Sequence, residues 1–130
     1  MKFQAKGHTL IKGTHKNTLE FTKESKLTEA GDCIIGINSN FNLEEIKEFV
    51  KNHRKARLIL EINNIKEKLT CETNKNFQNN KELVIRKSNF LSERTFGIYA
   101  TKSSKELSRK FIKELNNPNS IITISIEMFK

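Results

Sequence analysis

The sequence predicts one α+β domain, mostly antiparallel β-sheet in a sandwich or open barrel, with two accessory helices near residues 43–55 and 104–116. Its 130 residues suit a single domain, residues 1–130, that can bury a core. Short segments of alternating apolar and polar residues recur between turn residues, as in a β-rich protein. Only two segments, starting at Asn42 and Ser103, combine a capping residue with an apolar stripe at helical spacing.

The strands follow from alternation and from the turns between them. We expect them at 3–8, 15–23, 32–38, 58–62, 65–69, 82–87, 94–100 and 122–128. The segment 32–38 is apolar on both faces, which predicts a central strand. Asn63-Asn64 predicts a two-residue hairpin loop that places Glu61 opposite Lys66 and Leu58 opposite Leu69.

The two helices begin at capping boxes. Asn42 has Glu45 three residues later, and Ser103 has Glu106 at the same spacing. The first helix is expected to end in the densest basic cluster of the chain, which is Lys51, His53, Arg54, Lys55 and Arg57. Cations at a helix C-terminus favour the macrodipole, so this cluster has a structural explanation as well as a functional one.

Two passages resemble each other, at 15–62 and 82–127. In both, a strand, a turn, a second strand, a helix and a third strand follow in order, and Gly36 corresponds to Gly97. The similarity predicts either an internal duplication about a pseudo-twofold axis or simply two strand–helix–strand units of the same kind.

The formal net charge of +9 and the pI of about 9.7 favour a polyanionic partner, RNA more than DNA. The abundance of Lys, Asn and Ile also fits the codon bias of an AT-rich genome, which would raise the charge without any partner. No apolar run approaches the ~20 residues of a membrane span, and the N-terminus lacks the pattern of a signal peptide. We therefore expect a cytoplasmic protein without a membrane association, with Cys33 and Cys71 reduced and buried.

Three segments carry a resemblance to a known family: 31–36 (Gly-Asp-Cys-Ile-Ile-Gly), 84–88 (Val-Ile-Arg-Lys-Ser) and Arg94-Thr95. With them the chain resembles, over nearly its full length, the archaeal family called domain of unknown function 371. The resemblance implies a β-rich sandwich domain with accessory helices and no established activity. It maps the family pattern onto Gly7, His8, His15, Thr18, Glu20, Gly31, Asp32, Cys33, Arg86, Lys87, Ser88, Arg94 and Thr95. The chain departs from that pattern at Asn89, where an aspartate is usual, and in the Asn- and Lys-rich loop before Glu82, where relatives carry glycine and often histidine.

The candidates for acid–base chemistry are His8, His15, Glu20, Asp32 and Cys33, in a small enzyme or ligand-binding protein whose polar pocket would also include Arg86. Their spacing matches no metal motif, so we expect neither a metal nor another cofactor. Each also has a structural explanation, such as a buried thiol for Cys33 or a turn carboxylate for Asp32. We expect Asp32 to pair with Arg86 or Arg94, in a clasp or in a site.

The candidates for polyanion binding form two groups along the chain. They are Lys51, Arg54, Lys55 and Arg57 in the first group, and Arg86, Lys87, Ser88 and Arg94 in the second. Guanidinium forks and turn hydroxyls suit phosphate or carboxylate groups. The alternative for the second group is an ion pair across the sheet.

Overall fold

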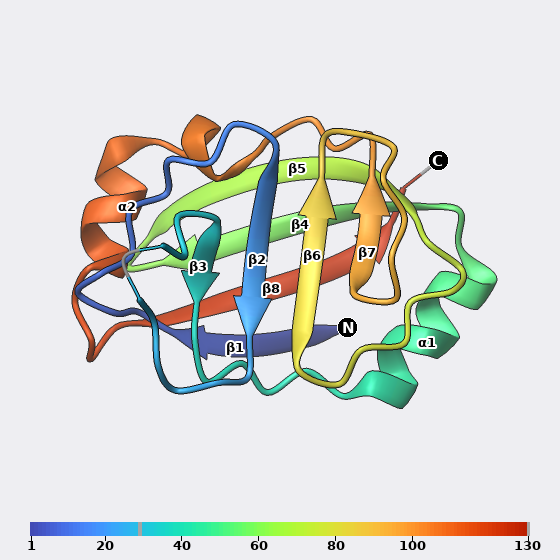
Figure 1. The fold of residues 1–130 in the computed structure, drawn as a ribbon, viewed down its shortest axis with the longest axis horizontal. Coiled ribbons are helices and arrows are strands. Elements are labelled where there is room, and N and C mark those ends of the chain that lie inside the picture. The colour runs from blue at the N-terminus through green and yellow to red at the C-terminus, as the bar shows by residue number, and fades with distance from the viewer. Residues whose placement is uncertain (29, 130) are drawn as a thin grey trace.

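Eight strands form one mixed β-sheet in the computed structural model, which describes residues 1–28 and 30–129 (Figure 1). The strand order is β1-β8-β4-β5-β7-β6-β2-β3, and the pairs β2–β3 and β6–β7 are parallel whereas the other neighbours are antiparallel. The strands are β1 (Lys2–Lys6), β2 (Thr18–Thr22), β3 (Ile34–Gly36), β4 (Lys55–Ile62), β5 (Ile65–Thr73), β6 (Glu82–Arg86), β7 (Thr95–Ile98) and β8 (Ile121–Met128). The prediction of one β-rich domain is confirmed.

The sheet is strongly curved, so that β2 and β6 cross in front of β4 and β8 in Figure 1. The side chains between these layers form the core, where Leu19, Phe21 and Ile85 from one side and Leu60 and Ile124 from the other are fully buried. A single β-bridge between Lys6 and Ile37 links the two edges of the strand order. It is not extended into a continuous ladder, so the sheet is not closed.

The helices lie at opposite ends of the molecule (Figure 1). Helix α1 (Leu43–Asn52) begins where predicted, with the Asn42 side chain accepting a hydrogen bond from the Glu45 N–H at 2.9 Å. Its amphipathic stripe buries Ile46 and Val50 against the sheet. Within the described part of the chain, no helix is long and apolar enough to cross a membrane.

The predicted second helix is divided in two. A 3-10 turn, η1 (Ser104–Glu106), carries the capping box, in which the Glu106 carboxylate accepts from the N–H of Ser103 at 3.0 Å. Leu107 is extended, and Ser108 then caps helix α2 (Arg109–Leu115). The box therefore starts a single turn, because an apolar residue buried at position 107 leaves the helical path.

Two other predictions need correction. β3 stands at the end of the strand order rather than at its centre, and it is apolar on both faces because the sheet curvature and flanking loops bury it. Helix α1 ends at Asn52, since His53 is already extended and β4 starts at Lys55. The predicted basic C-terminal cluster of this helix thus lies partly on a strand.

The predicted hairpin is confirmed in detail. Asn63 and Asn64 both have positive φ, at 46° and 69°, and they connect β4 to β5. Glu61 lies opposite Lys66 and Leu58 opposite Leu69.

Candidate functional site

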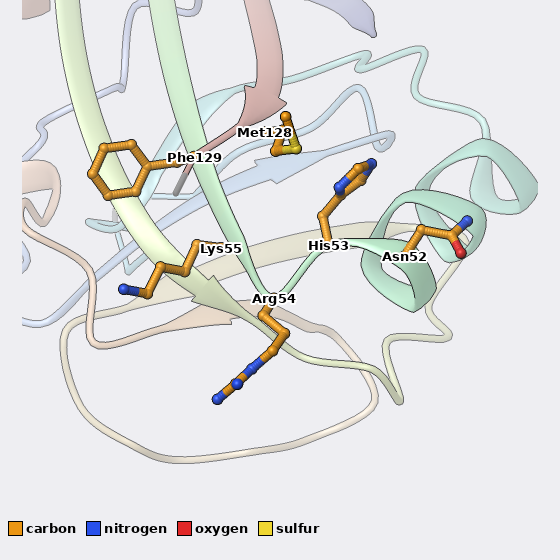
Figure 2. A pocket seen from close by; sticks show the side chains of 6 residues that line it. All are labelled: Asn52, His53, Arg54, Lys55, Met128 and Phe129. Carbon is orange, nitrogen blue, oxygen red and sulfur yellow. The ribbon is translucent and has the colours of Figure 1, made fainter.

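A hollow of about 420 Å³ lies where α1 joins β4, beside the end of β8 (Figure 2). We call it, together with the two hollows that adjoin it, the basic groove. This first hollow is lined by Asn52, His53, Arg54, Lys55, Met128 and Phe129. Figure 2 shows Arg54 and Lys55 extending away from the helix end, with Phe129 on the Lys55 side.

The chain turns from helix to strand at this hollow and is anchored there. The N–H of His53 closes the helix on the Phe49 carbonyl at 3.0 Å, and the two rings lie 4.7 Å apart. The Arg54 carbonyl accepts from the Thr73 N–H at 2.9 Å, which ties the segment to β5. The cations that follow therefore project from a fixed backbone.

The two adjoining hollows extend the groove across the sheet. One of about 160 Å³ shares Lys55 and Phe129 with the first and adds Thr70, Cys71, Glu72 and Tyr99. Another of about 500 Å³ shares Arg54 with the first and is further lined by Glu72, Thr73, Asn74, Lys75, Asn76, Leu91 and Ile98. The groove thus runs from the end of α1 to the ends of β5 and β7.

Arg57 lies beside the groove and contacts the Phe129 ring. Its guanidinium stands 4.9 Å from the centre of the Phe129 ring and 3.4 Å from the Glu127 carboxylate. The ion pair is partly exposed, so it contributes little stability. The Arg57 guanidinium thus contacts both the Glu127 carboxylate and the Phe129 ring.

The structure separates the predicted polyanion-binding residues by their partners. Lys87 is paired with Glu106 at 2.8 Å, and Arg94 with Glu82 at 3.2 Å. Arg86 donates from Nε to the Thr95 hydroxyl at 2.8 Å, and its guanidinium lies 4.9 Å from the Phe90 ring centre. In the first group, Lys51 is exposed in the last turn of α1, and Arg54 and Lys55 line the groove.

The two groups approach each other at Tyr99, which sequence reasoning missed as a site residue. Tyr99 is 53% exposed and lines the groove with Lys55 and Phe129. Its N–H donates to the Ser88 carbonyl at 3.1 Å, in the turn that follows Arg86. Its φ of +52° is uncommon for a residue with a bulky side chain. An exposed aromatic after the Gly97 position was the only signal in the sequence.

A second group of polar residues lies around the buried Glu20, on the face of β2 and β6 that points away from the core. Glu20 is only 4% exposed, and its Oε1 lies 3.7 Å from the Sγ of Cys33. Among the described residues, no N–H or O–H group donates to Oε2 of Glu20 when that carboxyl is ionised. Glu82 and Arg94 are partly exposed and bind each other. We call Glu20, Cys33, Glu82 and Arg94 the buried polar cluster.

Burial shifts the protonation of this cluster strongly. Burial, together with the neighbouring Glu82 carboxylate, raises the pKa of Glu20 to about 8. The pKa of Glu82 is lowered, first by a hydrogen bond from Glu20 and then by Arg94. Burial also raises the pKa of Cys33 to about 11, so its thiol is protonated at neutral pH. A protonated thiol is a poor nucleophile.

The five catalytic candidates do not all come together. Nδ1 of His8 accepts from the Leu10 N–H at 3.0 Å, and Nδ1 of His15 accepts from the Thr18 N–H at 3.1 Å. Asp32 offers its backbone carbonyl to Thr14 and Ser104. Of these candidates, Glu20 and Cys33 touch each other.

The expected pairing of Asp32 with an arginine is wrong. Arg94 binds Glu82, which is brought to it by the parallel pairing of β6 and β7, and Arg86 binds Thr95. Residues 1–28 and 30–129 contain no group of three or more ligating side chains able to hold a metal ion.

Two comparisons with known proteins match nearly the whole length of the chain. The family model described as "Domain of unknown function (DUF371)" matches residues 3–129. An uncharacterized protein of Methanocaldococcus jannaschii is 40% identical over 125 residues, which cover 92% of this chain and 93% of that protein. The chain therefore belongs to the DUF371 family.

Proposed function

We propose that this protein binds RNA through the basic groove. The observation that carries the proposal is the position of two cations, Arg54 and Lys55, in the lining of a hollow that also exposes aromatic surface, with Arg57 beside it. An anionic backbone with planar bases offers the complementary chemistry.

The helix macrodipole explains these cations less well once the end of α1 is known. Only Lys51 lies in the last turn of α1, whereas Lys55 and Arg57 belong to β4 and Arg54 to the connection. The macrodipole acts within the last turn, so it does not account for three of the four. Cations on a strand that face a hollow are better explained by an anionic ligand.

The charge of the rest of the chain supports the same partner. The net charge of +9 attracts a polyanion from a distance and raises the rate of encounter. One carboxylate, Glu72, lines the groove, and Glu127 lies beside it, where Arg57 offsets its charge. Lys75 adds a further cation on the other side.

The test is the salt dependence of binding to a short fluorescein-labelled oligouridine, followed by anisotropy. A protein that contacts about four phosphates of a single strand should show a log–log slope of about −3. Arg54→Gln and Lys55→Gln should each weaken binding at low salt and make the slope shallower by about 0.7. No binding at low ionic strength would refute the proposal.

A matched control separates the groove from the total charge. Lys110→Gln removes one positive charge from an exposed position on α2, at the other end of the molecule. It should leave the affinity within about twofold and the slope unchanged. If Lys110→Gln weakens binding as much as Lys55→Gln does, the groove is not the binding site.

Enzymatic function has less support. The hollows that form the groove do not include His8, His15, Glu20, Asp32 or Cys33. The thiol of Cys33 is held protonated, and Glu20 is covered. We therefore assign the buried polar cluster a structural role in this proposal.

We further propose that the chain is an internal duplication, with halves 2–62 and 65–128. These halves contain the predicted passages 15–62 and 82–127 and add β1 and β5. Phe3 pairs with Ile124 in β1–β8, and Glu67 pairs with Leu60 in β5–β4. Phe3 and Glu67 are 64 residues apart, and so are Leu60 and Ile124.

The parallel strand pairs also correspond between the halves. Phe21 lies beside Gly36 in the parallel pair β2–β3, and Ile85 lies beside Gly97 in β6–β7, each after an irregularity in register. Phe21 and Ile85 keep the shift of 64 residues, whereas the two glycines are 61 residues apart. The antiparallel pairs Glu20–Val84 and Leu60–Ile124 join residues that the shift relates to each other. This is the pattern expected where a pseudo-twofold axis passes through both pairs.

A further inference from the structure

We infer that the basic groove selects single-stranded RNA by stacking an unpaired base on Tyr99, beside Phe129. This inference rests on the proposed RNA binding and deepens it. It is carried by the backbone at Tyr99, by the surroundings of its ring and by a comparison within the chain.

The position of Tyr99 has a counterpart in the other half of the molecule. Asn38 follows β3 as Tyr99 follows β7, and both have positive φ, at 51° and 52°. The N–H of Asn38 donates to the Glu24 carbonyl at 2.9 Å, as that of Tyr99 does to Ser88 at 3.1 Å. The fold therefore imposes a left-handed residue at both places.

Asparagine and tyrosine are not equivalent in this conformation. Asparagine adopts the left-handed region far more readily than a residue with a large side chain. Burial does not compensate the tyrosine, because the residue is about half exposed. An exposed aromatic residue kept in this backbone conformation against a local cost indicates a ligand that its ring contacts.

The surroundings of the ring define that ligand. Tyr99 lines the same hollow as Lys55 and Phe129. The Phe129 ring also contacts the Arg57 guanidinium. Stacking needs a planar π-system, and the cations need a nearby phosphate. An unpaired nucleotide supplies both a planar base and a phosphate. In a duplex the faces of the bases are covered by neighbouring bases, and a polyphosphate has no base.

The sequence provides a direct probe, because Tyr99 is the only tyrosine and the chain has no tryptophan. We would titrate the full-length protein with oligouridine, with an RNA duplex of the same length and with inorganic polyphosphate, following tyrosine emission with correction for absorbance. Anisotropy of labelled ligands would report binding in parallel. We expect oligouridine to quench the tyrosine, and polyphosphate to bind without quenching.

Variants complete the test. Tyr99→Asn uses the residue that the chain itself places at the equivalent position, so it should fold. It should weaken oligouridine binding about tenfold, which corresponds to 1.4 kcal/mol, and leave polyphosphate binding unchanged. Tyr99→Phe retains the ring and should bind oligouridine within about twofold of the natural protein.

The outcomes separate this inference from the proposal beneath it. If oligouridine binds without quenching, or Tyr99→Asn binds it normally, base stacking is refuted and RNA binding by the groove stands. If duplex and single strand bind equally, the selection for single strands is refuted. If no nucleic acid binds at low salt, both are refuted.

Discussion

Replacing Glu20 by glutamine should change how the stability of this protein depends on pH. Burial raises the pKa of Glu20 from 4.5 in an exposed chain to about 8 in the folded state. The folded state therefore holds this proton more tightly than the unfolded state. The stability that Glu20 contributes in this way is fully present below pH 4.5 and is lost as the pH rises towards 8.

The size of the effect follows from the shift. Each pKa unit corresponds to about 1.36 kcal/mol, so the full loss is at most about 5 kcal/mol between pH 4.5 and 8. Glu82 acts in the opposite direction and at lower pH, because its lowered pKa adds stability only as the pH rises towards 4.5. Because the two carboxyls titrate as a pair, we expect about half of that maximum in the measured profile.

Urea unfolding at several pH values between 5 and 9 measures the effect. The natural protein should lose ~2–3 kcal/mol across this range, and Glu20→Gln should lose much less, because the amide keeps the shape without the charge. Glu44→Gln, at an exposed carboxylate on α1, is the control and should follow the natural protein. Parallel profiles for Glu20→Gln and the natural protein would refute the assignment of a protonated Glu20.

Two further predictions concern backbone positions shared by the halves. Tyr99→Asn should raise the free energy of unfolding by about 1 kcal/mol, because it relieves the left-handed tyrosine; equal or lower stability in urea unfolding would argue against strain there. Gly97→Ala should lower the free energy of unfolding by about 1–3 kcal/mol, because a Cβ would overlap the Cys71 side chain. Adding Cys71→Ala should restore part of that loss in thermal unfolding, and an unaffected Gly97→Ala protein would show that the close approach is not required.

How far the sequence predicts the fold depends on how local the signal is. The Asn63-Asn64 turn fixes both its own geometry and the register of its strands, so the β4–β5 hairpin is predicted residue by residue. The start of α1 is equally local, because Asn42 caps it through its own side chain. The division of the second helix at Leu107 has one local signal, Ser108, whose side chain caps α2, but the capping box of Ser103 and Glu106 favours an earlier start and the sequence alone does not decide between them.

The site is predictable to the same extent. The basic residues near position 54 are apparent in the sequence, but whether they end a helix or flank a groove depends on where β4 starts. The partner of Arg94 depends on strand order, because the parallel pairing of β6 and β7 brings Glu82 to it in place of Asp32. Tyr99 becomes a candidate only when its conformation is compared with that of Asn38.

Mapping of oligouridine onto the protein by amide chemical shifts would show directly where RNA binds. If RNA lies in the basic groove, perturbations at low salt should cluster at residues 53–57, at Tyr99 and at Phe129, and should disappear as salt is added. Perturbations centred on α2, or spread evenly over the surface, would contradict it.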